Sequence, residues 1–174
     1  MLRIRVLGGL ALEADGEPRP LPETARGRAL LAFCALNPGA HPRGRLAAAL
    51  RPDVLDRSAR ATLRQAIWAL RQAVGDDGGT AAILADRDRF GLAEDEIWVD
   101  VLELRRLAES GATDAALELA AGELLPELDD EWAVAARGAH HDAVGELLAR
   151  RAEEAAAAGD MAAAIARARR ALEH

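Results

Sequence analysis

Residues 57–74 read RSARATLRQAIWALRQAV, and the spacing of their side chains decides how the rest of the chain is interpreted. At about 100° per residue, the apolar side chains fall on one face of a helix: Ala59, Leu63, Ala66, Leu70, Ala73 and Val74. Four basic side chains share a flank, namely Arg57, Arg60, Arg64 and Arg71, and the outward face holds Gln65, Trp68 and Gln72. The segment contains no acidic residue, whereas an exposed amphipathic helix usually mixes Glu with Arg. We therefore predict a helix that is buried on one side and offers guanidinium, amide and indole groups on the other.

Such a face matches what reading DNA requires. Arg and Gln side chains hydrogen-bond base edges in the major groove, and flanking Arg residues neutralise phosphates. The other interpretation is a solvated amphipathic helix with Arg on its polar face. The outward indole of Trp68 is costly to leave in water, so it is expected to meet DNA, a protein partner or a neighbouring domain.

The segments on either side of this helix predict its setting. Residues 2–6, 10–14 and 18–21 are typical of short strands of a small antiparallel sheet, separated by Gly and Asp-Gly turns. Thr24 is expected to cap a helix over residues 25–36, and a second helix starts at Pro42 and ends near Pro52. After the helix that ends at Val74, residues 82–85 and 89–93 predict a strand pair. Strands, three helices and a hairpin in this order predict a winged helix-turn-helix over residues 1–95.

From about Glu96 the chain is expected to be helical, acidic and rich in Ala, with helices over residues 101–109, 113–125, 131–158 and 160–172. Residues 110–117 resemble residues 158–165, as in a repeated αα-hairpin. We therefore predict an all-α, tetratricopeptide-like domain over residues 96–174. The fold class is mostly α with a small β part (α+β).

Charge is distributed unevenly along the 174 residues. The whole chain carries −7, but residues 26–71 contain nine Arg, two Asp and no Glu, a net charge of +7 that leaves −14 on the rest. Every basic residue is Arg, which favours bidentate and phosphate contacts. The basic segment predicts a polyanionic partner, although the hairpin turn alternates Asp86, Arg87, Asp88 and Arg89 and is neutral.

Several other kinds of function are disfavoured. The longest apolar run has eight residues, too short to span a bilayer, so we expect a cytoplasmic protein with no membrane partner. The one cysteine, Cys34, lies on an apolar helix face and is expected to be buried and inert. His140 and His141 are adjacent and lack the i, i+4 partner that a zinc pair on one helix needs. Asp129, Asp130 and Glu131 are expected to cap the helix that contains Trp132. We predict no enzyme activity, no metal site and no cofactor.

The order of these segments resembles a known family. The stretches LRIRVLGGL (residues 2–10), RALLA (28–32) and SARATLRQ (58–65) are similar to the OmpR-type DNA-binding domain of actinomycete antibiotic regulatory proteins. The stretches IWVDV (97–101), GELLP (122–126) and DDEW (129–132) are similar to the bacterial transcriptional activator domain that follows it. The resemblance implies a transcriptional activator that binds direct repeats in double-stranded promoter DNA, as a homodimer, and contacts RNA polymerase.

The same resemblance assigns roles to individual residues. It places Arg64, Gln65 and Trp68 in the base-facing stretch, and Arg60 and Arg71 near phosphates. It places Arg87 or Arg89 at the wing.

A second hypothesis comes from the departures. The neutral wing, the −14 outside the basic segment, and Ala69 at a position that many relatives of this fold fill with a base-contacting Arg favour a protein-interaction or signalling module. Its winged helix would no longer bind DNA. The chain could then be a fragment of a larger regulatory ATPase, although it contains no G-x-x-x-x-G-K-[ST] phosphate-binding loop of its own.

Overall fold

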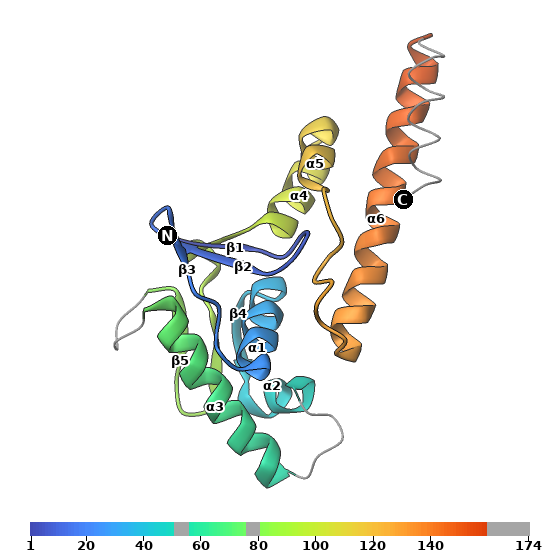
Figure 1. The fold of residues 1–174 in the computed structure, drawn as a ribbon. Coiled ribbons are helices and arrows are strands. Elements are labelled where there is room, and N and C mark those ends of the chain that lie inside the picture. Colours follow the sequence, from blue (N-terminus) through green and yellow to red (C-terminus); the bar gives the residue numbers. More distant parts are fainter. Residues whose placement is uncertain (51–55, 76–80, 160–174) are drawn as a thin grey trace.

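The structure, a computed structural model, describes residues 1–50, 56–75 and 81–159. It is an α+β fold in which a small sheet lies across one end of three packed helices, and a long helix runs up the side (Figure 1). The three N-terminal strands, the three helices and the hairpin that follows them come in the order expected from the sequence. No helix in the part of the chain that the structure describes is long and apolar enough to cross a membrane.

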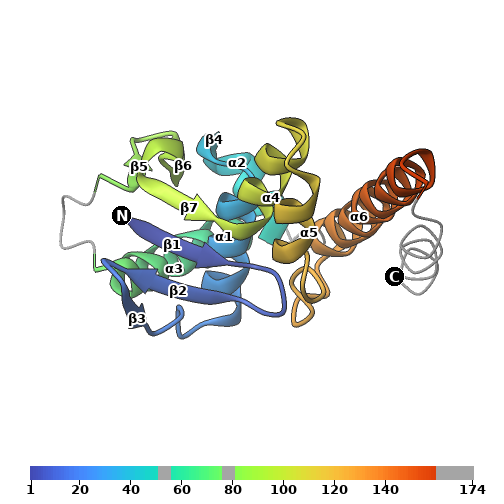
Figure 2. The same ribbon diagram turned by 90° about the horizontal axis from the view of Figure 1, so that it is seen from above.

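The first sheet has four strands in the order β3-β2-β1-β7. They are β1 (Leu2–Arg5), β2 (Ala11–Ala14), β3 (Glu17–Arg19) and β7 (Ile97–Val99). The three N-terminal strands were predicted and are confirmed. Their antiparallel pairing is also confirmed, β1 with β2 and β2 with β3. The fourth strand was not predicted: β7 pairs in parallel with β1, with Leu2 opposite Ile97 and Ile4 opposite Val99. Figure 2 shows the four strands side by side over the helices.

Three helices form the body beneath this sheet: α1 (Ala25–Leu36), α2 (Arg43–Leu50) and α3 (Asp56–Val74). The predicted bounds of α1 and α3 are confirmed. Thr24 caps α1, since its Oγ1 accepts a hydrogen bond from the backbone N–H of Gly27 at 2.9 Å. At the other end, Asn37 Nδ2 donates to the carbonyl of Phe33 at 2.9 Å. Both α1 and α2 pack against α3.

A second sheet has the order β4-β6-β5, formed by β4 (Gly39–Pro42), β5 (Ile83–Ala85) and β6 (Arg89–Leu92). The β5–β6 hairpin was predicted and is confirmed. The start of the second helix at Pro42 is a correction, because Pro42 ends β4, where it pairs with Arg89, and α2 begins one residue later. Proline tolerates this place because a strand at a sheet edge leaves its outer side unpaired.

The second half contains η1 (Glu94–Glu96), α4 (Asp100–Glu109), α5 (Thr113–Leu119) and α6 (Glu131–Ala157). The chain is not helical directly from Glu96, because β7 comes before α4. The predicted helix over 113–125 is also too long. Residues 123–125 leave the helix to bind the end of β1: Gly8 N–H donates to the carbonyl of Glu123 at 2.9 Å, and Leu125 N–H donates to Val6 at 2.8 Å. The helix expected over 160–172, with the second half of the hairpin repeat, lies outside the described residues.

The apolar core continues across the predicted domain boundary at residues 95 and 96. One cluster of buried side chains runs from Leu2 through α1, α2 and α3 to Val99, Val101, Leu124 and Ala133. A smaller cluster joins α4, α5 and α6 through Leu104, Ala116, Ala120, Val144, Leu147 and Leu148. The division into domains 1–95 and 96–174, and the tetratricopeptide-like character of the second, stay predictions.

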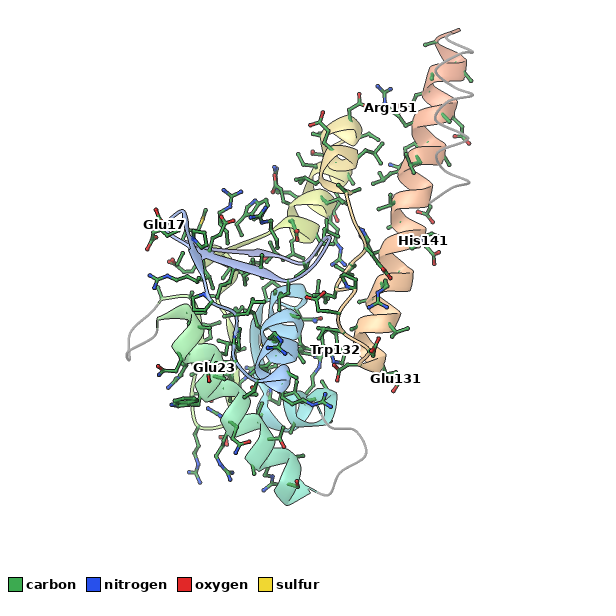
Figure 3. All side chains as sticks on the ribbon, in the orientation of Figure 1. Glu17, Glu23, Glu131, Trp132, His141 and Arg151 are labelled. Atoms are coloured by element: carbon green, nitrogen blue, oxygen red, sulfur yellow. The ribbon has the colours of Figure 1, made fainter. Side chains whose placement is uncertain are left out.

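The start of α6 is joined to α1. Asp130 is the N-cap residue and Glu131 lies in the first turn, as expected, but the Asp130 side chain makes no capping hydrogen bond. Its Oδ1 instead accepts from Arg26 Nη1 of α1 at 2.6 Å. The Trp132 ring packs edge-on against Phe33 with centroids 5.3 Å apart. Figure 3 shows Glu131 and Trp132 at this lower end of α6, beside α1 and α2.

Candidate nucleic-acid interface

Helix α3 is divided lengthwise as the sequence predicts. Its inner face is buried and includes two residues not assigned to it from the sequence, Ile67 and Ala69: the buried set is Ala59, Leu63, Ala66, Ile67, Ala69, Leu70, Ala73 and Val74. This face packs on α1 and α2. Because nearly every third or fourth side chain is anchored in the core, the helix cannot rotate about its axis without exposing apolar surface.

The outer face of α3 carries the polar side chains. Arg60, Arg64, Gln65 and Gln72 are exposed, and Trp68 is 62% exposed. By helical phase, Trp68 lies near the centre of this exposed arc, with Arg64 one turn before it. The structure therefore brings Arg64, Gln65 and Trp68 together on one uncovered surface.

The other basic residues of α3 are placed less uniformly. Arg71 is half-buried, and Arg60 and Arg71 each take part in an interaction within the chain. Arg57 belongs to α3, but its side chain lies outside the described part of the structure. Arg87 and Arg89 are both exposed at the turn between β5 and β6.

The first residue of α2 also reaches this region and was not singled out from the sequence. Arg43 Nη2 donates to the carbonyl of Asp86 at 3.0 Å, which ties α2 to the hairpin turn. Arg45 is exposed on the same helix, with its guanidinium 6.0 Å from the Phe33 ring centroid. The signal for both was the unusual Arg density of residues 26–71, but density alone does not say which Arg faces outward.

A shallow groove of about 200 Å³ adjoins Trp68. One wall is α3, through Trp68, Ala69 and Gln72, and the other is the segment from Pro20 to Thr24 that leads into α1. Arg28 fastens this segment by donating to the carbonyls of Pro22 and Glu23 at 3.2 and 3.1 Å. The indole thus has room on one side for an apolar group of a ligand.

These features belong to a fold that has been seen before. The chain shares its fold with EmbR. The solved structure is that of Mycobacterium tuberculosis EmbR in complex with a low-affinity phosphopeptide, and it superposes with a TM-score of 0.74 at 24% sequence identity. The match covers 95% of this chain and 48% of EmbR, so the chain spans about half the length of that protein. No protein-family model and no curated protein sequence matches the chain.

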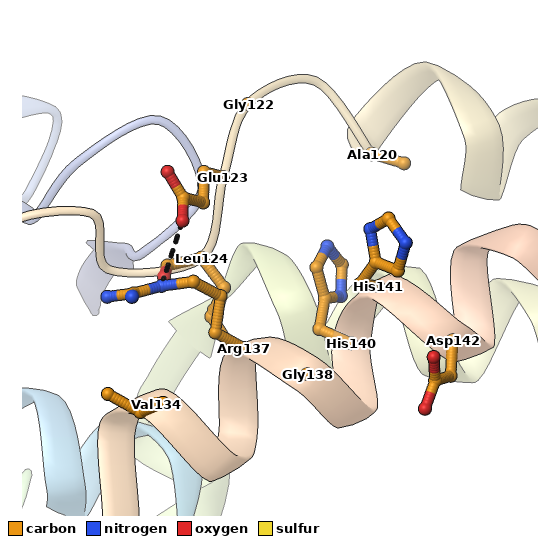
Figure 4. Close-up of a pocket in the computed structure, with 10 residues that line it drawn as sticks. All are labelled: Ala120, Gly122, Glu123, Leu124, Val134, Arg137, Gly138, His140, His141 and Asp142. Atoms are coloured by element: carbon orange, nitrogen blue, oxygen red, sulfur yellow. Dashed lines mark hydrogen bonds and ion pairs between the residues drawn. The ribbon is translucent and has the colours of Figure 1, made fainter. Parts of the chain in front are cut away.

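A cavity lies away from α3, between α6 and the segment 120–124 (Figure 4). Its volume is about 690 Å³. Arg137 on its wall pairs with Glu123 at 3.1 Å and donates to the carbonyls of Leu124, Leu125 and Leu128 at 3.0, 2.7 and 2.8 Å. This guanidinium therefore holds the segment against α6.

The two adjacent histidines that line this cavity lie in different surroundings. His140 is buried and His141 is exposed, on different faces of α6. Among residues 1–50, 56–75 and 81–159 no three His, Cys, Asp or Glu side chains are grouped to hold a metal ion. Cys34 is fully buried, and burial raises the pKa of its thiol to about 12, which removes the thiolate that a nucleophile requires.

Proposed function

We propose that the chain is a sequence-specific DNA-binding transcriptional regulator, an activator, that places α3 in the major groove. The observation that supports this best is the exposed face of α3. Arg64, Gln65 and Trp68 point away from the body, and no part of the described chain covers them. Arg suits guanine and Gln suits adenine as bidentate partners, and an apolar ring suits a thymine methyl group.

The surrounding basic residues supply the contacts that carry no sequence information. Arg60, Arg71 and Arg57 flank the reading face, and Arg87 and Arg89 extend it through the wing; all five are proposed to lie near phosphates. The likeness to EmbR supports the fold on which this arrangement rests. We further propose that the protein is not an enzyme, binds direct repeats of promoter DNA as a homodimer, and contacts RNA polymerase through its helical half.

The test starts from selection of bound duplexes out of random DNA, followed by measurement of affinity for the selected site across a range of salt concentrations. If about four phosphates are contacted per subunit, the logarithm of affinity falls with the logarithm of salt concentration at a slope of about −3.6. Sedimentation of the same complex reports whether one or two chains bind. Failure to retain any duplex at low salt would reject the proposal.

Single substitutions then separate reading from phosphate neutralisation. Arg64→Ala and Gln65→Ala are each expected to cost about 1–3 kcal/mol on the selected site and to relax its sequence preference. Arg105→Ala removes an exposed Arg from α4, away from α3, and is the matched control; it should leave affinity and preference unchanged. Equal losses for Arg64 and Arg105 would mean that only overall charge matters.

The exposed indole supports a second candidate function. A ring that is 62% exposed beside a groove also suits a protein partner, as expected for an interaction module that no longer binds DNA. A photoreactive residue at position 68 decides between the two: crosslinks to selected DNA support the regulator. Crosslinks to a defined protein partner that excess duplex cannot suppress support the module.

A further inference from the structure

The turn between β5 and β6 is held by its own first residue. Asp86 Oδ1 accepts hydrogen bonds from the backbone N–H groups of Asp88 and Arg89, both at 2.7 Å. The backbone N–H of Asp86 also donates to the carbonyl of Arg89 at 3.1 Å. These bonds fix the chain on both sides of Arg87, whose side chain is exposed at the tip.

Arg43 holds the same turn from the side of α2. Its backbone N–H donates to the carbonyl of Asp88 at 2.9 Å, and its Nη2 donates to the carbonyl of Asp86 at 3.0 Å. Arg43 therefore binds the carbonyl groups of the residues directly before and directly after Arg87. Because α2 packs against α3, this clamp gives the tip of the turn a fixed position relative to α3.

The clamp changes what the alternating charges of the turn mean. Counted as charges, Asp86 and Asp88 cancel Arg87 and Arg89, and the turn is a poor ligand for phosphate. The carboxylate of Asp86, however, is held by two backbone N–H groups, which lower the pKa of Asp86 and offset part of its charge. Its place in the structure is that of a hydrogen-bond acceptor that shapes the turn.

We propose that Asp86 and Arg43 are positioning residues for DNA binding, which hold the β5–β6 turn in the shape that presents Arg87 to a backbone phosphate of duplex DNA. The inference rests on the proposed function and adds a specific role for an acidic residue that charge counting places against it. It assigns Asp86 a favourable effect on affinity, whereas simple electrostatics assigns it an unfavourable one.

The test compares three replacements in the full chain, all measured on the duplex that the unaltered chain selects. Asp86→Asn removes the charge but keeps a side-chain oxygen that accepts from the turn, whereas Asp86→Ala removes both. Asp88→Asn is the matched control, because Asp88 contributes to the turn through its backbone and its carboxylate can be neutralised without loss of a bond. Far-UV circular dichroism and the thermal midpoint establish that each variant is folded.

The variants are expected to change DNA affinity in opposite directions, depending on whether they remove only a negative charge or also the hydrogen bonds that shape the turn. Asp86→Asn and Asp88→Asn should bind as tightly as the unaltered chain or up to several-fold more tightly, because each removes a negative charge near phosphate. Asp86→Ala and Arg43→Ala should bind more weakly, and their salt slope should flatten by about 0.9, the loss of one phosphate contact. Arg87→Ala should show the same slope, and adding it to Asp86→Ala should flatten the slope no further.

Two outcomes separate this inference from the proposed function. If the unaltered chain binds duplex DNA but Asp86→Ala binds as tightly as Asp86→Asn, Asp86 acts only as a charge, and the positioning role is overturned while the regulator stands. If the unaltered chain retains no duplex, both are overturned.

Discussion

Replacing Asp100 by alanine tests the architecture at the point where β7 passes into α4. Asp100 is 5% exposed, and its carboxylate accepts hydrogen bonds from three backbone N–H groups. Val6 donates to both oxygens at 3.0 Å, Leu7 donates at 3.0 Å, and Val101 donates at 2.8 Å. One side chain therefore joins the end of β1 to the first turn of α4, across more than ninety residues of sequence.

The magnitude follows from the donors left behind. Asp100→Ala deprives all three N–H groups of their acceptor, and each buried unsatisfied donor costs about 1–3 kcal/mol. The groups of Val6 and Val101 are buried and that of Leu7 is partly buried, so we expect a loss of about 3–5 kcal/mol in the free energy of unfolding. For a chain of this size that corresponds to a fall of about 6–20 °C in the thermal midpoint.

Urea titration followed by circular dichroism measures this loss. Asp95→Ala is the control, because Asp95 is exposed in the adjacent turn η1, and its removal should change the free energy of unfolding by no more than about 0.5 kcal/mol. A loss below about 1 kcal/mol for Asp100→Ala would refute the reasoning, since it would mean that the N–H groups find other acceptors or are not buried.

Three further predictions concern buried groups. Burial raises the pKa of Asp100 above its ordinary 3.8, so the folded chain favours the protonated acid. The free energy of unfolding, measured relative to that of Asp100→Asn, should therefore fall as pH rises through and above 3.8. A free-energy difference between the two proteins that grows with pH would contradict this. The thiol of Cys34, whose pKa burial raises to about 12, should react with a disulfide reagent only as fast as the chain unfolds, and rapid labelling of the native protein would place it at the surface. Gly27→Ala puts a methyl group 2.8 Å from Pro22 Cβ and should lower the free energy of unfolding by about 1–3 kcal/mol. At Gly44 in α2 an added methyl group meets nothing, so Gly44→Ala should raise the free energy of unfolding by about 0.5–1 kcal/mol. Calorimetry of both variants checks the two opposite signs.

Local signals explain what the sequence predicted well. Helix α3 has both a strong apolar period and an uninterrupted polar face, so its bounds and most of its buried side follow from spacing alone. Helix α1 is framed by Thr24 and Asn37, whose side chains satisfy backbone groups within four residues. The predicted reading residues Arg64, Gln65 and Trp68 are exposed for the same reason, because they fall opposite the apolar face.

Non-local pairing explains what the sequence did not predict. Strands β4 and β7 pair with strands that lie about fifty and ninety-five residues away in the sequence, so no local pattern reveals either pairing. The early end of α5 has a similar cause, because residues 123–125 bind the end of β1 in place of extending the helix. Asp130 is a residue type that commonly caps helices, but its carboxylate accepts a hydrogen bond from Arg26, which is 104 residues away. The hydrogen bonds that Arg43 donates to the β5–β6 turn are also non-local and could not be predicted from a local pattern.

The joint between the two halves is built from backbone as much as from side chains. Gly122 has φ +96°, and a Cβ at this position would lie 2.6 Å from Gly8 Cα. Only glycine at position 122 therefore lets the segment before α6 come this close to the end of β1. Arg137 binds three carbonyls of that segment, and Asp100 binds the end of β1 from the other side.

A displacement of α6 would therefore pull on the end of β1 and, through the Arg26–Asp130 pair, on α1, against which α3 packs. Helix α3 has no direct share in these contacts, but α1, which packs against it, does. A partner or effector that moves α6 can therefore alter how α3 is presented by straining α1, and the Arg26–Asp130 and Phe33–Trp132 contacts are the places to test for such coupling.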